Sequence, residues 1–249
     1  MKKTVIITGA SSGIGRALAL EFASRGYNVG IAARRLEKLQ ALQQEMSALP
    51  GASGIQVALA TLDVKDTFSV GPALQQLFAE FERVDVVVVN AGVNQLTRVG
   101  KGQLAEEVAL IQTNLVGAVA TVNAAAEYFK TQGGGHVVGI SSLASLSAIP
   151  TQAAYCATKA GFSMYMDAAA IELKKHKVRF TKILPGFVKT DIVENMDQYP
   201  FLISAEQAAK EIVGHVEKGS KEGVVPAFPW RIMKPLMGKI PDGLWKYLM

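Results

Sequence analysis

The chain has 249 residues, of which 49% are hydrophobic and 19% are charged. This composition supplies enough apolar side chains for a folded core and excludes a disordered chain. The 26 basic and 21 acidic residues give a formal net charge of +5, which is too weak to indicate nucleic-acid binding. A single cysteine, Cys156, excludes an internal disulfide framework, and three scattered histidines indicate no metal site.

The N-terminus does not have the pattern of a targeting segment. Its apolar run, Val5–Ile7, is too short for the hydrophobic region of a signal peptide, and a glycine-rich turn follows at once. The sequence also lacks a run of about 18 apolar residues, as a membrane-spanning helix would need. We therefore expect a cytoplasmic protein without a transmembrane helix.

Two kinds of segment alternate along the chain. Short runs rich in Val and Ile predict strands at Thr4–Thr8, Asn28–Ala32, Ile55–Ala60, Val84–Asn90, His136–Ser141, Val178–Leu184 and Gly223–Val225. Helical spacing predicts helices at Gly13–Arg25, Leu36–Leu49, Asp66–Phe81, Glu106–Lys130, Ala153–His176 and Ser204–Lys218. Near-continuous apolar strands separated by helices indicate a parallel sheet covered on both faces. We predict one α/β domain over residues 1–249, a Rossmann-type doubly wound sheet of about seven strands.

The first strand is followed by a glycine-rich turn that opens a helix. Gly9 permits the sharp turn, Gly13 lets the backbone approach a pyrophosphate, and Gly15 lets the helix pack closely on the sheet. The helix N-terminus offers unpaired N–H groups and a partial positive charge to phosphates. A tight strand-to-helix turn without a ligand is the alternative. We expect the dinucleotide-binding residues here to be Gly9, Ser11, Ser12, Gly13, Ile14 and Gly15.

The end of the second strand bears on the choice of nucleotide. An acidic residue at this place would bind the adenosine ribose hydroxyls, but the sequence has Arg34 and Arg35. Two guanidinium groups favour a 2′-phosphate through charge and bidentate hydrogen bonds. A solvated pair that opens the next helix is the alternative. We predict NADP(H) as the cofactor.

An ordered set of motifs resembles the short-chain dehydrogenase/reductase family from residue 3 to about residue 190. Its members are Thr8–Gly15, Asn90-Ala91-Gly92, Asn114, Ser142, Tyr155-x-x-x-Lys159, Pro185-Gly186 and Thr190. The resemblance implies the strand order 3-2-1-4-5-6-7 and a nicotinamide cofactor lying across the carboxyl ends of the strands. It also implies cofactor contacts from Asp63, Val64, Asn90, Ala91, Gly92, Tyr155, Lys159, Pro185, Gly186, Val188 and Thr190. One departure is Val89, which stands where the family usually has an asparagine.

The chemistry of the Tyr155 and Lys159 pair agrees with that resemblance. The two residues are four apart on a predicted helix and therefore share one face. A free tyrosine has a pKa of about 10, and a nearby ammonium stabilises its phenolate. Lowering that pKa by about three units needs about 4 kcal/mol, which we expect Lys159 and the positive nicotinamide to supply. Tyr155 would then exchange a proton with the substrate oxygen.

Two further polar residues complete the predicted catalytic group. Ser142 follows the fifth strand, at the edge where open α/β sheets bind ligands, and its hydroxyl can bind the substrate oxygen. Ser141 is an adjacent competitor, and the family's spacing selects Ser142. Asn114 interrupts an apolar helix, where asparagine is unfavourable, and this indicates a bound water or a helix distortion. The resemblance implies that Asn114 holds a water that relays protons to Lys159, and a satisfied core polar group is the alternative.

The substrate side is less well defined by sequence. The candidate segments are Val93–Leu96, Leu143–Ile149 and Phe187–Phe201, with Leu143, Leu146, Ile149, Ile192, Val193, Met196, Tyr199 and Phe201 as candidate side chains. This mostly aliphatic wall indicates an apolar carbonyl compound or alcohol as the small-molecule substrate. Ordinary packing of a lid on the body is the alternative for each residue.

Residues 226–249 form an amphipathic tail that departs from the family. We expect Ile232, Met233, Leu236, Met237 and Ile240 on one helical face, with Arg231, Lys234 and Lys239 opposite. Pro235 predicts that the helix begins or kinks there. The tail is interpreted as packing on its own domain, a subunit contact, an active-site cover or a peripheral membrane contact.

We expect a homodimer or homotetramer. A catalytically idle NADP(H)-sensing module and a membrane-surface lipid carbonyl reductase remain alternatives to the soluble enzyme.

Overall fold

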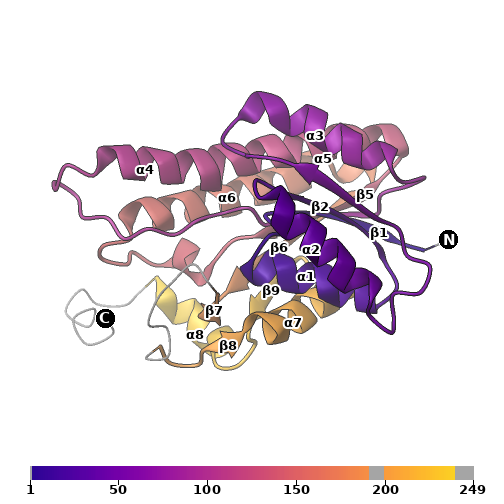
Figure 1. Cartoon of the computed structure of the whole chain (residues 1–249). Helices are drawn as coiled ribbons and strands as arrows, with labels where there is room; N and C mark the ends of the chain where they lie inside the picture. Colours follow the sequence, from indigo (N-terminus) through magenta and orange to yellow (C-terminus); the bar gives the residue numbers. More distant parts are fainter. Residues whose placement is uncertain (1, 191–198, 239–249) are drawn as a thin grey trace.

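The computed structural model describes residues 2–190 and 199–238, and a seven-stranded parallel sheet forms its centre (Figure 1). The strands are β1 (Thr4–Thr8), β2 (Asn28–Ala33), β3 (Val57–Thr61), β4 (Val86–Val89), β5 (Gly135–Ile140), β6 (Val178–Pro185) and β9 (Glu222–Val225). Their order is β3-β2-β1-β4-β5-β6-β9, which confirms the order implied by the resemblance. A short parallel pair, β7 (Val188–Lys189) and β8 (Ile203–Ser204), lies apart from the main sheet and was not predicted.

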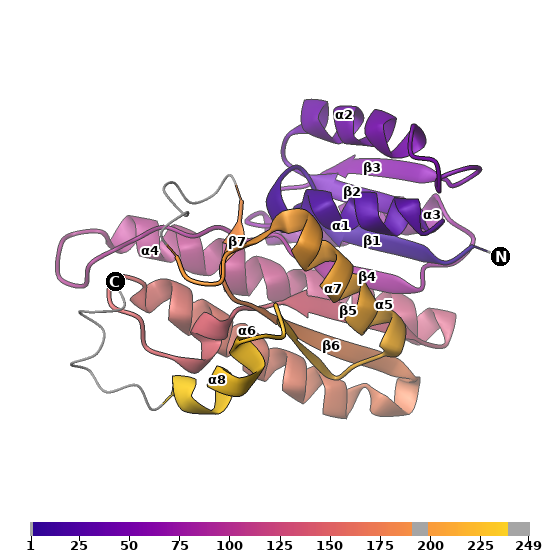
Figure 2. The same ribbon diagram turned by 90° about the horizontal axis from the view of Figure 1, so that it is seen from below.

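Helices cover both faces of the sheet, as the apolar strands require. One face packs against α1 (Gly13–Ser24), α2 (Leu36–Ser47) and α7 (Ala205–Lys218), with α7 lying beside α1 (Figure 2). The other face packs against α3 (Thr67–Ala79), α5 (Gly117–Gln132) and α6 (Ala153–Glu172). The strands between these layers are almost wholly buried, so the alternating pattern of a half-exposed sheet is absent from the described strands β1, β4 and β6.

The long helix predicted at Glu106–Lys130 is not continuous. The structure has α4 (Leu104–Ile111), a π-helical segment η1 (Gln112–Val116) and then α5. A π segment carries an extra residue in its turn, and such segments occur often at functional sites. The predicted distortion around Asn114 is therefore confirmed, because Asn114 lies at the middle of η1.

The helical run Leu104–Gln132 is long and apolar enough, by length and composition, to cross a membrane. In the fold its α5 portion is a core helix, since Val122, Ala125 and Phe129 pack against the sheet. A core helix of an α/β domain passes the same compositional test.

Two remaining elements follow the central strands. A short 3₁₀ helix η2 (Leu143–Leu146) follows β5, and α8 (Trp230–Met237) follows β9. Helix α8 contacts η2, although the two are about ninety positions apart in sequence (Figure 2). Helix α8 begins at Trp230 and contains Pro235, so the helix does not begin at this proline, and the predicted kink stays a prediction.

Candidate active site

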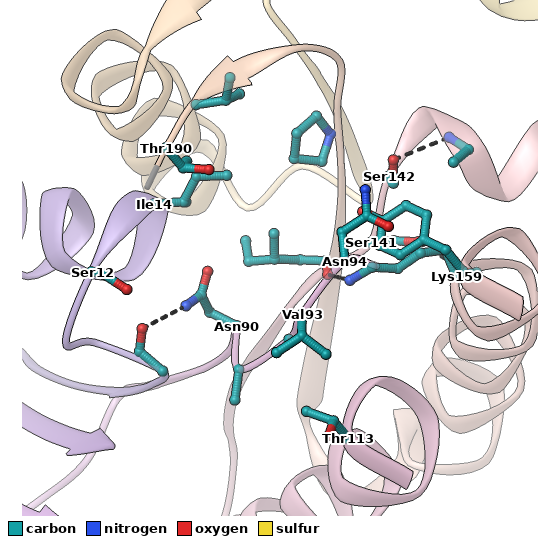
Figure 3. Close-up of a pocket in the computed structure, with 18 of the residues that line it drawn as sticks. Ser12, Ile14, Asn90, Val93, Asn94, Thr113, Ser141, Ser142, Lys159 and Thr190 are labelled. Carbon is teal, nitrogen blue, oxygen red and sulfur yellow. Dashed lines mark hydrogen bonds between the residues drawn. The ribbon is translucent and has the colours of Figure 1, made fainter. Parts of the chain in front are cut away.

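One cavity of about 700 Å³ opens where the carboxyl ends of the central strands meet (Figure 3). Its wall is built from the segments that follow β1, β2, β3, β4, β5 and β6, together with residues of α6 and α8. Open α/β sheets bind ligands at this edge because the loops diverge there. Of the predicted site residues, the wall includes Gly9, Ser11, Ser12, Ile14, Arg34, Arg35, Asp63, Val64, Asn90, Ala91, Gly92, Ser142, Tyr155, Lys159, Pro185, Gly186, Val188 and Thr190.

The glycine-rich turn is closely packed, as predicted. Gly9 has a positive φ of 69°, a backbone conformation that glycine adopts without strain. A Cβ on Gly15 would lie 2.3 Å from the Gly9 carbonyl oxygen, so only glycine allows α1 to approach the turn this closely. Gly13 and Gly15 are not on the wall of the described cavity, and a Cβ on Gly13 would lie 3.2 Å from the Thr190 methyl group. Both glycines therefore determine the shape of the turn without lining the described cavity.

The N-terminus of α1 leaves backbone donors for an anion. Within the part of the chain that the structure describes, the Ser12 side chain makes no capping hydrogen bond to α1. Instead Arg35 donates hydrogen bonds to the Ser11 hydroxyl at 2.9 Å and to the Ser12 hydroxyl at 3.1 Å. Arg34 is exposed on the same wall. Uncapped helix N–H groups beside two guanidinium groups fit the phosphates of a dinucleotide.

Strand β3 is followed by two residues, Asp63 and Val64, that have structural partners of their own. The Asp63 carboxylate accepts a hydrogen bond from the Lys65 N–H at 3.0 Å, as an aspartate that stabilises a turn does. The buried Val64 lies under Gly117, where a Cβ would come within 2.5 Å of the Val64 carbonyl oxygen. Both residues still line the cavity.

The Asn90 side chain joins the ends of β1 and β4. Its amide nitrogen donates to the Thr8 carbonyl oxygen at 3.0 Å and to the Gly9 carbonyl oxygen at 3.2 Å. The Thr8 hydroxyl in turn accepts from the backbone N–H of Asn90 at 3.2 Å and of Ala91 at 3.3 Å. The structure therefore gives Asn90 a positioning role at the floor of the cavity (Figure 3).

Ser142, Tyr155 and Lys159 meet on one side of the cavity. Ser142 precedes η2, and its hydroxyl oxygen accepts a hydrogen bond from the Ala144 N–H at 3.1 Å. Lys159 is buried, and its ammonium donates to the Ile140 carbonyl oxygen at 3.0 Å. The Lys159 nitrogen lies 5.7 Å from the centre of the Tyr155 ring.

The pKa of Tyr155 differs from the expectation. We expected Lys159 to lower it, but burial raises the pKa of Tyr155 above its ordinary value, with a hydrogen bond from Ser142 opposing that rise. Burial also lowers the pKa of Lys159 to about 8. For the protein alone the pKa of Tyr155 is therefore raised by burial and not lowered by Lys159, whose ammonium donates to the Ile140 carbonyl oxygen. The combined effect of Lys159 and the positive nicotinamide stays a prediction.

The structure distinguishes between the two adjacent serines. The Ser141 hydroxyl donates to the Lys159 carbonyl oxygen at 3.1 Å and shares a 2.7 Å hydrogen bond with Ser163. Both partners belong to α6, so Ser141 ties β5 to that helix. Both serines line the cavity, but Ser142 is the one whose hydroxyl lies beside Tyr155, so we assign the contact with a substrate oxygen to Ser142.

The Asn114 side chain holds the backbone of Val93. Its amide oxygen accepts from the Val93 N–H and its amide nitrogen donates to the Val93 carbonyl oxygen, both at 2.8 Å. Asn114 is 1% exposed and does not belong to the wall of the described cavity. Its side chain thus acts as a satisfied core polar group that fixes the loop after β4, and the water relay stays a prediction.

The wall beyond the catalytic group is more aromatic than the sequence suggested. Phe187 stacks on Tyr199 with ring centres 4.6 Å apart and meets Trp230 edge-on at 5.6 Å. Phe201 is half exposed and contacts Trp230 without lining the cavity. The wall here comprises Val93, Asn94, Leu143, Ala144, Ile149, Gln152, Phe187, Tyr199, Trp230 and Met237. Of the other candidates, Leu146 packs beside this wall, and Ile192, Val193 and Met196 lie outside the described residues.

The tail contributes residues that the sequence did not place in the site. Trp230 is 6% exposed and Met237 8% exposed, and both line the cavity. Ile232 and Leu236 are 68% and 62% exposed, so the predicted apolar face is not buried as a whole, and Met237 is its buried member among the described residues. Lys234 forms an ion pair with Glu222. The described tail therefore packs on its own domain as an active-site wall, while Ile240 and Lys239 lie outside the described residues.

Comparisons with known proteins agree with this geometry. The family model for short chain dehydrogenases matches residues 3–200. An uncharacterised oxidoreductase of Myxococcus xanthus is 37% identical over 234 residues, which cover 94% of this chain and 90% of that protein. Another from Mycobacterium tuberculosis is 32% identical over 244 residues, covering 98% and 96%. A solved alcohol dehydrogenase from the archaeon Thermococcus sibiricus, complexed with 5-hydroxy-NADP, is 28% identical with a TM-score of 0.81, covering 90% of this chain and 96% of that one. The chain therefore belongs to the short-chain dehydrogenase/reductase family and is an oxidoreductase of that family.

Proposed function

We propose that the protein interconverts an apolar carbonyl compound and the corresponding alcohol with NADP(H) as cofactor. The observation that carries this proposal is the meeting of Ser142, Tyr155 and Lys159 on one side of the cavity that the glycine-rich turn also lines. A proton donor, a hydroxyl partner and a buried cation are what the conversion of a carbonyl to an alcohol requires of the protein.

Tyr155 is the acid of this proposal. Because burial raises its pKa above the ordinary value, the phenol keeps its proton at neutral pH. It can therefore donate that proton to a carbonyl oxygen placed within hydrogen-bond distance. The Ser142 hydroxyl donates a second hydrogen bond to the same oxygen and stabilises the charge that develops there. When bound, the nicotinamide supplies the hydride for the carbonyl carbon or accepts it from the alcohol.

Lys159 stabilises the Tyr155 oxygen through its positive charge. With a pKa of about 8, its amine is mostly an ammonium at neutral pH. Its place beside Tyr155, at 5.7 Å from the ring centre, stabilises negative charge on the phenol after proton donation. Its hydrogen bond to Ile140 holds it in that place.

The test of this chemistry is the Tyr155→Phe variant. We expect it to lose at least about 100-fold in kcat while binding NADPH as well as the wild type, because one positioned proton donor contributes about 10²–10⁴-fold. NADPH consumption at 340 nm would be followed with medium-chain and long-chain ketones, ketoacyl thioesters, steroid ketones, diketones, aldehydes and keto sugars. A variant that keeps wild-type turnover would contradict the role of Tyr155. Turnover confined to keto sugars would contradict the apolar substrate class.

The preference for NADP(H) is supported by charge at the end of β2. Arg34 and Arg35 are both exposed on the cavity wall, and Arg35 is already held by two serine hydroxyls. The structural neighbour from Thermococcus sibiricus is described as complexed with 5-hydroxy-NADP. Arg34 makes no hydrogen bond or ion pair with the residues that the structure describes, and its guanidinium beside that of Arg35 suits a 2′-phosphate, which can accept from both.

Reversal of one of these charges tests the preference. We expect Arg34→Asp to weaken NADPH binding by at least about 10-fold and to leave NADH binding within about 3-fold, since only NADPH carries the 2′-phosphate. Dissociation constants from calorimetry would measure both. Arg98→Asp is the matched control, because Arg98 is an exposed arginine outside the described cavity wall. Equal losses for the two nucleotides would refute the phosphate role.

A further inference from the structure

Two buried side-chain atoms lack a hydrogen-bond partner among the described residues, the Asn94 amide oxygen and the Trp230 indole nitrogen. Both residues line the cavity. The Trp230 nitrogen lies close to Gly186, since a Cβ added there would be 2.5 Å from it, and this contact supplies no hydrogen-bond acceptor. The Asn94 oxygen lies beside the proposed reacting groups (Figure 3). A buried amide oxygen without a partner is unfavourable, so the Asn94 oxygen points to a ligand.

The position of Asn94 is fixed from two sides. The Asn114 amide binds both backbone polar groups of Val93, the residue before it, at 2.8 Å. Gly92 lies against the catalytic lysine, since a Cβ there would be 3.7 Å from the Lys159 nitrogen. The segment that carries Asn94 is therefore held beside the reacting groups. Figure 3 shows the Asn94 side chain directed toward the end of the cavity where Ser142 lies.

The Asn94 amide is complementary to a hydroxyl group in its hydrogen bonding. Asn94 makes no hydrogen bond with any residue in the described ranges, so its amide offers one acceptor oxygen and two N–H donors. A hydroxyl group both donates and accepts and can satisfy both sides of that amide. A second carbonyl or an ether oxygen can only accept, which would leave the buried Asn94 oxygen unpaired.

We propose that Asn94 binds a hydroxyl group that the substrate carries next to its reacting carbonyl. The substrate class is then a hydroxy ketone, or a vicinal diol in the oxidative direction, and this rests on the proposed function. The rest of the substrate lies against the apolar wall that includes Leu143, Ile149 and Phe187. Asn94 is thus a specificity-determining residue, separate from the proton-transferring group.

A matched pair of ketones tests the proposal. 2-Hydroxy-1-phenylethanone and acetophenone differ by one hydroxyl group and share the aromatic ring. We expect the wild-type kcat/KM to be at least about 10-fold higher for the hydroxy ketone, a difference of about 1.4 kcal/mol. Asn94→Leu should remove this preference and leave kcat/KM for acetophenone within about 3-fold of wild type. Gln95→Leu is the control and should keep the preference, because Gln95 is an exposed amide outside the described cavity wall.

Three outcomes would overturn the assignment. Equal losses for both ketones in Asn94→Leu would show a purely structural role. A preference for 2-methoxy-1-phenylethanone as large as that for the hydroxy ketone would show that the substrate oxygen only accepts. A wild type without any preference would also contradict the proposal.

A binding measurement separates this inference from the proposed reaction. Calorimetry in the presence of NADP⁺ would compare 1-phenylethane-1,2-diol with 1-phenylethanol. Tighter binding of the diol, lost in Asn94→Leu and kept in Tyr155→Phe, supports the hydroxyl site even where no ketone turns over. If the diol binds no better than the monoalcohol while acetophenone is reduced, the proposed function stands and the role of Asn94 fails.

Discussion

At the scale of single residues, the protein alone does not favour the Tyr155 phenolate that the Tyr155-x-x-x-Lys159 motif predicted. Burial raises the pKa of Tyr155 and lowers that of Lys159 to about 8, so removal from water has a larger effect than attraction between the two groups. The buried Lys159 ammonium is instead held by the Ile140 carbonyl oxygen. This state suits proton donation from the tyrosine, and it makes Lys159 the group that titrates first above neutral pH.

A pH profile tests this order of titration. The ammonium of Lys159 predominates below pH about 8 and is lost above it, whereas Tyr155 stays protonated there. We therefore expect kcat/KM for NADPH, which reports the free enzyme, to be level from pH 6 to 7.5 and to fall about 10-fold per pH unit well above 8. Steady-state rates between pH 6 and 10 would measure it. Lys159→Arg, which keeps its charge above pH 10, should lose the decline even if its rate is lower.

Two results of the pH profile would contradict the assignment to Lys159. A wild-type profile that stays level to pH 10 would contradict the lowered pKa of Lys159. A decline that persists in Lys159→Arg would assign it to another group.

At the scale of elements, one of the contacts between the described tail and the site depends on a glycine. Gly186 follows β6, and the indole of Trp230 from α8 occupies the space where a side chain would stand, with contacts of 2.5 Å and 2.8 Å to an added Cβ. Trp230 also packs with Phe187, the residue after that glycine. Helix α8 therefore supports the turn from which Gly186, Val188 and Thr190 line the cavity.

A side chain at position 186 tests whether α8 and the turn after β6 depend on each other. We expect Gly186→Ala to lower the free energy of unfolding by about 1–3 kcal/mol, because the added methyl group must displace a buried indole. Thermal or chemical unfolding would measure it. Gly214→Ala is the matched control, since Gly214 lies inside α7 with no described atom within 4 Å of an added Cβ. It should be neutral or stabilise by up to about 1 kcal/mol.

A double-mutant cycle makes the test specific for the contact. In a Trp230→Ala background, Gly186→Ala should cost clearly less than in the wild type, because the clashing ring is gone. Equal costs in both backgrounds would show that Trp230 does not limit the space at Gly186.

At the scale of the whole molecule, most of the fold could be predicted from the sequence. The first strand was predicted with its observed bounds, Thr4–Thr8, and the bounds of the other main strands agree within two residues. The reason is that a parallel sheet buried on both faces needs short, continuous apolar runs, and these are visible in one dimension. The two-residue strands β7 and β8 have too few residues to form such a pattern.

Part of the candidate site was predictable for a similar local reason. The residues after β1, β2, β4 and β5 line the cavity because parallel strands bring their carboxyl ends to one edge. Asn114 was predicted beside the catalytic group, but its amide binds the Val93 backbone, and sequence spacing cannot assign a hydrogen-bond partner. The peripheral membrane contact stays a prediction, with Ile232 and Leu236 as the exposed apolar residues of the described tail.

The sequence by itself determined the α/β class, the family resemblance and the segments that carry the turn, Ser142, Tyr155 and Lys159, because these depend on local spacing and on hydrophobic runs. Only the tertiary structure decided which groups these side chains meet. It placed Trp230 and Met237 in the wall, left the Asn94 amide oxygen without a hydrogen-bond partner among the described residues, buried Lys159 and partly buried Tyr155. Burial and long-range contacts set these properties, and they arise when segments far apart in sequence pack together.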